Sequence, residues 1–152
     1  KAVDARKSLV IDYDIYGEGE AMLAWLDKHI TIYSGDRSAA EVSEDLINTI
    51  YEKVKEAELP IGHMKFFIDD GDQRQKISYT TMGQKYIVPV SLVGKTRDIS
   101  LLINARVQAE PGMVEKIIEA AEREIAERTG SRVIVNKLAA FQPGYPRPTY
   151  RM

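Results

Sequence analysis

The chain has 152 residues, 44% of them hydrophobic and 29% charged, which is the composition of one globular domain with a core of its own. Its 21 Lys and Arg and 23 Asp and Glu side chains give a formal net charge of −2, so no general attraction to nucleic acid or to an anionic membrane is expected. It contains no cysteine, which excludes disulfides, thiolate catalysis and cysteine metal sites and fits a cytoplasmic protein. No apolar run approaches the roughly 20 residues that a membrane-spanning helix needs.

The first part of the chain is predicted to form two strands. Residues 8–13 are apolar and rich in β-branched side chains, and the glycines of residues 17–20 end that strand. Residues 21–33 fit either a helix at their start or a long strand with alternate residues on opposite faces. The strand is the preferred interpretation, because no helix stop separates Leu26 from Ile30.

A helix is predicted over residues 38–57. Ser38 and Glu41 match a capping box, in which a hydroxyl and a carboxylate three residues apart satisfy free amides at the start of a helix. Pro60 ends the helix. Apolar side chains recur at every fourth position and form a stripe for the core, namely Val42, Leu46, Ile50 and Val54.

Three more strands follow this helix. Residues 63–68 and 76–81 are predicted to pair as a hairpin around the acidic turn at residues 69–72. Residues 86–93 are also apolar, but Pro89 has no N–H to donate to a ladder. This run is therefore predicted to be an edge strand or an extended linker.

The second half of the chain repeats the strand, helix, strand order of residues 30–68. A strand over residues 99–107 precedes a helix over 111–128, which begins at a proline and stops at Gly130, and a strand over 132–138 follows. Two such units side by side bury their helices on one face of a shared sheet. The sequence therefore predicts an α+β, ferredoxin-like fold with a mainly antiparallel sheet of six or seven strands and two helices on one face.

The whole chain, residues 1–152, is predicted to be one domain that ends in an extended tail. Residues 142–152 carry three prolines in a short stretch, which forbids a helix and suits a segment laid over a surface or offered to a partner. The face of the sheet away from the helices is left for solvent, a ligand or a second chain. Side chains expected to make that face partly apolar, as interfaces are, are Trp25, Phe67, Tyr79 and Leu102.

Motifs for nucleotide binding are incomplete. Gly94-Lys95-Thr96 resembles the end of a phosphate-binding loop, but Pro89 stands where the first glycine belongs and a strand follows. Gly17-Glu18-Gly19 lacks the third glycine of a dinucleotide fingerprint, since Met22 occupies that position. The glutamates of the second helix alternate with basic residues and indicate a solvated, salt-bridged face, namely Glu115, Glu119, Glu122, Glu124 and Glu127.

The two histidines, His29 and His63, fall in predicted strands. A metal site that joins them with Asp27 or Asp69 is conceivable, and so is acid–base catalysis by His63 with one of these carboxylates. Nothing in their spacing requires either, and a local hydrogen-bond partner is the simpler interpretation of each. Three carboxylates crowd the turn after residue 68, where they fit a hairpin better than a calcium loop, namely Asp69, Asp70 and Asp72.

Aromatic residues in the predicted strands are compatible with RNA binding, namely Phe66, Phe67, Tyr79 and Tyr86. That function needs a glycine- and aromatic-rich signature whose exposed rings stack on bases. The signature is absent and the chain is not basic, so no nucleic-acid partner is expected.

Four segments resemble the region C-terminal to the GTPase domain in CobW-like, metal- or cobalamin-associated P-loop proteins. They are residues 19–27, residues 61–65 (IGHMK), residues 102–105 (LINA) and residues 141–151 (FQPGYPRPTYR). The resemblance implies an accessory half of such a protein that meets a client protein, a metal or a corrinoid. It implies no GTPase activity for this chain, which lacks the nucleotide-binding half and the family's cysteine motif, and which has Tyr150 where a histidine is expected.

These observations favour a non-catalytic binding or assembly domain with a protein partner or a second copy of the chain. No metal is predicted, and no nucleotide-binding motif indicates a cofactor. The alternatives are a small enzyme that uses His63 with a nearby carboxylate, or a small-molecule sensor, since paired strand–helix–strand units often dimerise around ligands. Side chains expected to bind the partner are Trp25, His63, Lys65, Phe67, Tyr145 and Arg147.

Overall fold

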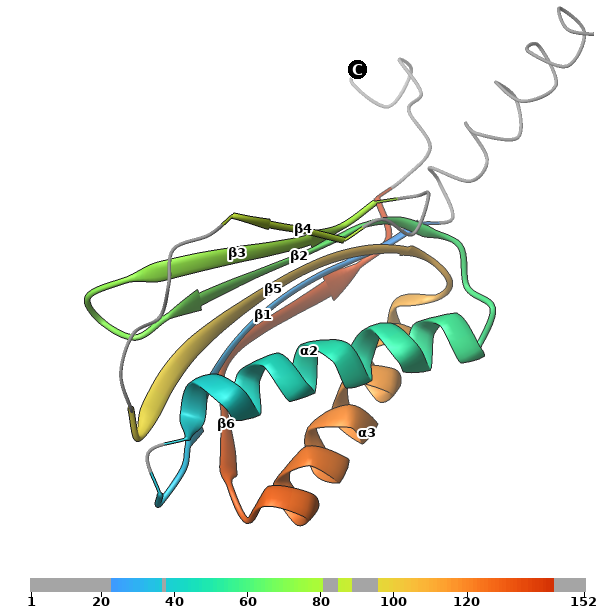
Figure 1. The fold of residues 1–152 in the computed structure, drawn as a ribbon. Helices are drawn as coiled ribbons and strands as arrows, with labels where there is room; N and C mark the ends of the chain where they lie inside the picture. The colour runs from blue at the N-terminus through green and yellow to red at the C-terminus, as the bar shows by residue number, and fades with distance from the viewer. Residues whose placement is uncertain (1–22, 37, 81–84, 89–95, 144–152) are drawn as a thin grey trace, which may run out of the picture.

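The computed structural model describes residues 23–36, 38–80, 85–88 and 96–143 (Figure 1). This part of the chain contains β1 (Leu23–Tyr33), α2 (Ala39–Glu56), β2 (Ile61–Asp69), β3 (Arg74–Tyr79), β4 (Lys85–Val88), β5 (Asp98–Gln108), α3 (Pro111–Thr129) and β6 (Arg132–Phe141). The strands form one sheet in the order β4-β3-β2-β5-β1-β6, and every neighbouring pair is antiparallel. Both helices lie on the same face of this sheet, as Figure 1 shows. Neither of these two helices is long and apolar enough to cross a bilayer.

The predicted repeat is confirmed. The units β1-α2-β2 and β5-α3-β6 interleave, so that β5 lies between β1 and β2, and β1 lies between β5 and β6. This is the ferredoxin-like arrangement that the sequence predicts. The hairpin partner β3 and then β4 extend the sheet beyond β2, and β4 forms an edge as expected. The predicted strand at residues 8–13, Pro89 and most of the Pro-rich tail lie outside the described residues.

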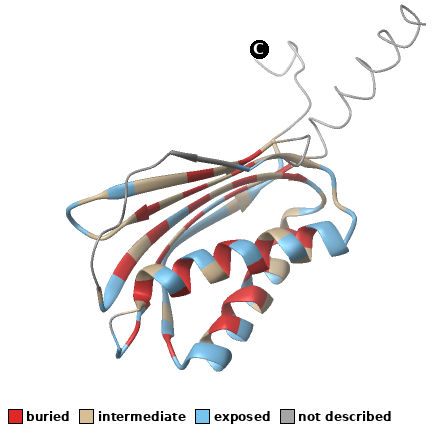
Figure 2. Cartoon of the chain, viewed as in Figure 1, coloured by how far each residue is buried: buried red, intermediate tan, exposed pale blue. Residues whose placement is uncertain are grey.

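The core lies between the sheet and the helices because each strand alternates its side chains. β5 is buried at every second residue from Ile99 to Val107, and these side chains meet the apolar stripe of α2 and the inner side of α3 (Figure 2). Each large apolar side chain that is fully buried contributes about 1.5–3 kcal/mol to stability. The largest apolar side chains with no exposed surface include Leu26, Ile30, Leu46, Phe66 and Leu101.

The start of α2 departs from the prediction. Ser38 occupies the N-cap position, but its side chain makes no capping hydrogen bond, and its hydroxyl donates instead to the carboxylate of Asp36. The Asp36 carboxylate also accepts from the hydroxyl of Ser34 and from the Ser38 N–H, which is the amide that Glu41 would accept in a capping box. The expected capping box with Glu41 is therefore wrong, although the helix begins where the sequence places it.

The ends of α3 follow the prediction. Pro111 stands in the first turn, where its missing N–H leaves no bond unmade. Gly130 adopts the left-handed conformation with a φ of 73° and donates its N–H to the carbonyl of Ala126. A residue with a Cβ is strained in that conformation, which explains a glycine at this helix end.

One ion pair lies inside the core. Lys28 on β1 is 2% exposed, and its Nζ lies 2.9 and 2.8 Å from the two carboxylate oxygens of Glu122 on α3. Burial raises the pKa of Glu122, and the Lys28 ammonium partly opposes that shift. The prediction that all the α3 glutamates face solvent is therefore wrong for Glu122, which is 7% exposed.

Candidate functional site

The candidate site is the open face of the sheet, the face that no described element covers. On β1, β2 and β5 the residues between the buried positions point to this face and are partly or fully exposed. Because β5 separates β1 from β2, side chains from all three strands meet there. The central ones are Trp25 and Asp27 on β1, His63, Lys65 and Phe67 on β2, and Leu102, Asn104 and Arg106 on β5.

A first hollow, which we call the Trp25 hollow, has a volume of about 460 Å³. The Arg106 guanidinium lies 3.8 Å from the centre of the Trp25 ring, and the Phe141 ring centre lies 5.8 Å from the Trp25 ring centre. Asn104 donates to the carboxylate of Asp27 on the neighbouring strand. The lining also includes His63, Lys65, Phe67 and Ala105. Aromatic rings, a cation and polar groups therefore share one recess.

His63 is surrounded by positive charge in this hollow. Partial burial lowers its pKa below the usual 6.5, and the nearby cations Arg106, Lys65 and Lys76 lower it further. Its Nδ1 is covered and has no hydrogen-bond partner among the described residues. A carboxylate that oriented the ring as a general base would bond to such a nitrogen and would raise the pKa. His63 is thus a neutral ring in a cationic setting.

Neither candidate carboxylate is close to His63. Asp69 lies six residues further along β2, which corresponds to about 20 Å. Asp27 lies two strands away, level with Lys65 rather than with His63. The expected acid–base pair is therefore not assembled in this structure.

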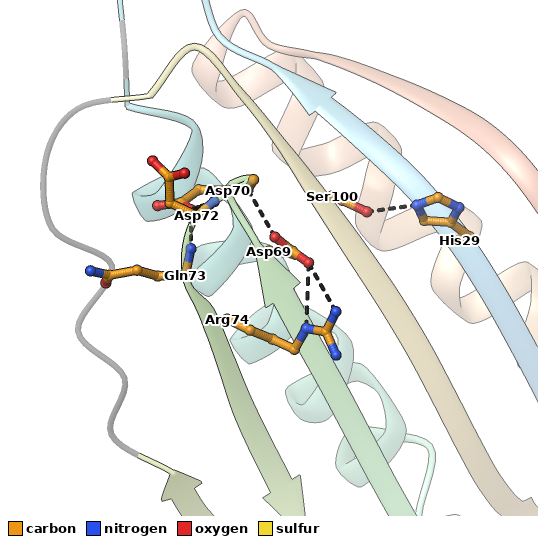
Figure 3. Close-up of polar contacts among 8 residues, drawn as sticks. His29, Asp69, Asp70, Asp72, Gln73, Arg74 and Ser100 are labelled. Carbon is orange, nitrogen blue, oxygen red and sulfur yellow. Dashed lines mark hydrogen bonds and ion pairs between the residues drawn. The ribbon is translucent and has the colours of Figure 1, made fainter.

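A second hollow of about 440 Å³, the His29 hollow, lies further along the same face. The Nε2 of His29 lies 2.6 Å from the hydroxyl of Ser100, and Asp69 accepts from the guanidinium of Arg74 at 3.3 and 3.4 Å (Figure 3). The apolar side chains of Phe67 and Leu102 also line it. Figure 3 shows His29 paired with Ser100 and Asp69 paired with Arg74, so these groups form a hydrogen-bonded surface rather than a reactive cluster. The covered Oε1 of Gln73 has no hydrogen-bond partner among the described residues.

The acidic turn after β2 is a hairpin turn, as expected. The carboxylate of Asp70 accepts the N–H groups of Asp72 and Gln73 at 2.8 and 2.7 Å, and Asp69 accepts the N–H of Gly71. These bonds occupy one oxygen of Asp70, and the N–H of Gly71 and the Arg74 guanidinium occupy the two oxygens of Asp69. Among the described residues no group of three or more His, Asp or Glu side chains could hold a metal ion.

The two histidines do not meet. His29 lies opposite Leu102, which lies opposite Phe67, and His63 is four residues from Phe67 along β2. Strand geometry puts the two histidines about 16 Å apart. A metal site that joins them is therefore wrong, and the local partner predicted for His29 is Ser100.

The aromatic residues of the sheet divide between its faces. Phe67 and Trp25 reach the open face, but Tyr79 faces the helices, where its ring stacks on Tyr51 at 4.0 Å and its hydroxyl donates to Asn48. Phe66 is also buried on that side. Placing Tyr79 on the open face was therefore wrong.

Charge is unevenly distributed over the open face. Of its cations, only Arg74 forms an ion pair with a described residue. Three of the others lie over rings, with Lys76 5.8 Å from the Phe67 centre and Arg132 5.2 Å from the Tyr33 centre, in addition to Arg106. Cations on this face are Lys65, Arg74, Lys76, Arg106, Arg132 and Lys137, and the carboxylates are Asp27, Asp69 and Asp98. The face is therefore positive although the whole chain is not.

The structure brings four of the six expected binding residues together. Trp25, His63, Lys65 and Phe67 all line the Trp25 hollow. Tyr145 and Arg147 lie outside the described residues. Sequence analysis missed Arg106, Asn104 and Phe141, which enter this hollow from β5 and β6. Strand alternation could have assigned their faces, but only strand order places them beside Trp25.

Comparisons with known proteins assign no family and no function to this chain. No family model and no curated protein matches this chain. A hydantoinase/carbamoylase family amidase from Burkholderia ambifaria has 17% identity and a TM-score of 0.41 over 78% of this chain and 27% of its own. A putative aminohydrolase from methicillin-resistant Staphylococcus aureus has 10% identity and a TM-score of 0.47 over 84% of this chain and 31% of its own. AtUAH in complex with (S)-hydroxyglycine has 14% identity and a TM-score of 0.45 over 77% of this chain and 28% of its own. This chain spans less than a third of each, and these identities and TM-scores are too low for the activities named to bear on it.

Proposed function

We propose that this chain is a non-catalytic binding and assembly domain that uses the open face of its sheet to hold an acidic segment of a protein partner. The observation that carries the proposal is the set of cations on that face that form no ion pair with a described residue and are interleaved with Trp25, Phe67 and Leu102. Aromatic residues and arginines are enriched in protein interfaces. A positive patch steers an oppositely charged partner toward such a face.

The same face suits a protein better than a nucleic acid. Arg106 lies directly over the Trp25 ring and occupies the surface on which a base would stack. An acidic polypeptide can place its carboxylates on the cations and its apolar side chains against Phe67.

The experiment measures binding of a fluorescein-labelled poly-glutamate peptide to the full chain by anisotropy, with single-stranded oligo-uridine RNA as a second probe. Lys65→Glu combined with Arg106→Glu should weaken peptide binding more than about tenfold, and added salt should weaken it as well. Lys116→Glu combined with Arg123→Glu, two exposed positions on α3, makes the same charge change on the opposite side of the sheet and should leave binding unchanged. Equal loss in both variants, no peptide binding, or a preference for the RNA would overturn the proposal.

For the longer protein from which such a domain would come, we propose the accessory half of a CobW-like P-loop protein. The support is the set of sequence segments that resemble that family, and two of them, residues 61–65 and 102–105, lie on adjacent strands of the sheet. Its test is whether this chain co-purifies with a CobW-like GTPase domain expressed separately. Absence of a complex at micromolar concentrations of both would count against it.

A further inference from the structure

The edge strand β6 carries more exposed large hydrophobic residues than any other described element. It lies at the end of the sheet and pairs only with β1 among the described strands. Of the seven large hydrophobic residues that are exposed in the described part of the chain, four belong to β6: Ile134 is 40% exposed, Val135 49%, Leu138 38% and Phe141 45%. A long, apolar edge strand with unpaired backbone groups is a site for pairing with another chain.

These four side chains lie on both faces of the sheet. Phe141 pairs with Trp25 and points to the open face, whereas Leu138 pairs with the buried Lys28 and points to the helix face. Ile134 pairs with Thr31 on the open face, whereas Val135 pairs with the buried Ile30 on the helix face. A partner docked on the open face would leave the helix-face side chains in water. Only a strand added alongside β6 covers both sets and also pairs the outer backbone groups of β6, which no described strand pairs.

The helix layer leaves room for such a strand. Between α3 and β6 lies a hollow of about 430 Å³ that Glu119, Ala126, Val133 and Ile134 help to line. α3 therefore does not extend over β6 far enough to cover it. A neighbouring copy can place its own side chains there without moving the helix.

We propose that β6 pairs antiparallel with β6 of a second copy of this chain, around a two-fold axis perpendicular to the sheet. In this arrangement each exposed group meets its own counterpart, so the contact closes after two copies and leaves no free β6 edge. The two sheets become one continuous sheet with all helices on the same face. The inference does not depend on the partner proposed for the open face, because it uses the outer edge of β6.

One register that avoids opposed cations centres on Ala139. It places Lys137 opposite Phe141 of the partner subunit, both on the open face, where a cation over a ring is favourable. It also places Leu138 opposite Ala140 of the partner subunit on the helix face. The small side chain on the axis allows close approach of the two strands.

A second such register centres on Ile134. There Arg132 faces Asn136 of the partner subunit, and Val133 faces Val135 of the partner subunit. Both residues of the second pair are β-branched, which suits paired strands. A register centred on Lys137 would oppose two ammonium groups and is disfavoured.

The first measurement is the mass of the full chain by sedimentation equilibrium, where a dimer is expected at about 100 µM, well above the Kd of a specific contact. Val135→Lys or Leu138→Lys should raise the dimer Kd more than about tenfold. Met113→Lys is the matched control, because Met113 is 48% exposed on α3 rather than on β6, and it should leave the dimer intact. A wild-type chain that stays monomeric, or equal loss in all three variants, would overturn the proposal.

Cysteine cross-linking tests the contact independently of stability. Because the chain has no cysteine, Ala139→Cys and Ile134→Cys each introduce a single thiol, and a residue on the axis lies within disulfide distance of its counterpart. Mild oxidation should cross-link one of these variants rapidly and so identify the register. Asp72→Cys, on the exposed turn, should cross-link slowly. If neither edge variant cross-links faster than Asp72→Cys, the strand pairing is wrong.

Discussion

Replacing Lys28 with methionine should strongly destabilise the fold. Methionine keeps a side chain of similar length but removes the ammonium that lies 2.8 and 2.9 Å from the carboxylate oxygens of Glu122. The Glu122 side chain is 9% exposed, so water cannot replace the lost partner. Breaking a buried pair by removing one member costs about 3–5 kcal/mol. In a domain of this size the loss corresponds to a drop in Tm of roughly 6–20 °C.

The assay is urea unfolding of four proteins at pH 7, with circular dichroism as the signal. Lys28→Met should lose about 3–5 kcal/mol of unfolding free energy, whereas Lys28→Met with Glu122→Leu should recover most of it, since an apolar pair of similar volume needs no ionic partner. Lys53→Met is the control, because its ion pair with Glu124 is also close, at 3.0 Å, but its side chains are 28% and 45% exposed. That loss should stay below about 1 kcal/mol.

The pH dependence gives a second check on the same variant. Burial raises the pKa of Glu122, and Lys28 opposes the shift, so Lys28→Met raises this pKa further. A carboxyl whose pKa is raised in the fold is most stabilising when protonated, below its unfolded value of 4.5, and loses that contribution as the pH rises through its folded pKa. The defect of Lys28→Met should therefore grow from pH 4.5 toward pH 7. A loss under about 1 kcal/mol in Lys28→Met, or a double variant no more stable than Lys28→Met alone, would refute the reasoning.

Two further predictions concern His63 and the glycines of α3. Burial and three cations lower the pKa of His63 below 6.5, so the unfolded chain binds more protons than the folded chain as the pH falls below 6.5, and the stability of the wild type should decline there. His63→Gln should make this decline shallower when Tm is measured from pH 7.5 to 5. An unchanged slope of Tm against pH would contradict the prediction. Gly130→Ala should lower the free energy of unfolding in urea by about 1 kcal/mol, because φ is 73° at this residue. Gly112→Ala, in the first turn of α3 with open space around the added Cβ, should raise it by about 0.5–1 kcal/mol. Similar effects of the two alanines would show that the left-handed conformation is not what selects glycine at the helix end.

Much of the fold could be predicted because its signals are local. The recurrence of Val42, Leu46 and Ile50 at every fourth position predicts which side of α2 is buried, and a proline and a glycine mark the two ends of α3. The alternation in β5 predicts which of its residues enter the core. The capping box at Ser38 failed although its motif is local, because the Asp36 carboxylate accepts the Ser38 N–H that Glu41 would accept in a capping box.

The candidate site was harder to predict because it depends on strand order. Phe67 and Tyr79 are both aromatic residues in strands, and nothing near either residue in the chain says which one faces the helices. Pairing of Tyr79 with the buried Met64 decides it. Arg106 reaches Trp25 only because β5 lies next to β1, although 81 positions separate these residues in the chain numbering.

The sequence by itself determined the helices, most strands, their buried faces and the duplicated strand–helix–strand plan, since these follow from periodicities of 3.6 and 2 residues within short segments. Only the tertiary structure decided that Lys28 and Glu122 form a buried pair across 94 positions, and that β6 is the edge. It also places an excess of cations on one face of the sheet, although the net charge of the whole chain is −2. Composition adds charges without regard to position, whereas folding sorts them onto different surfaces, and the field that a partner meets depends on that sorting.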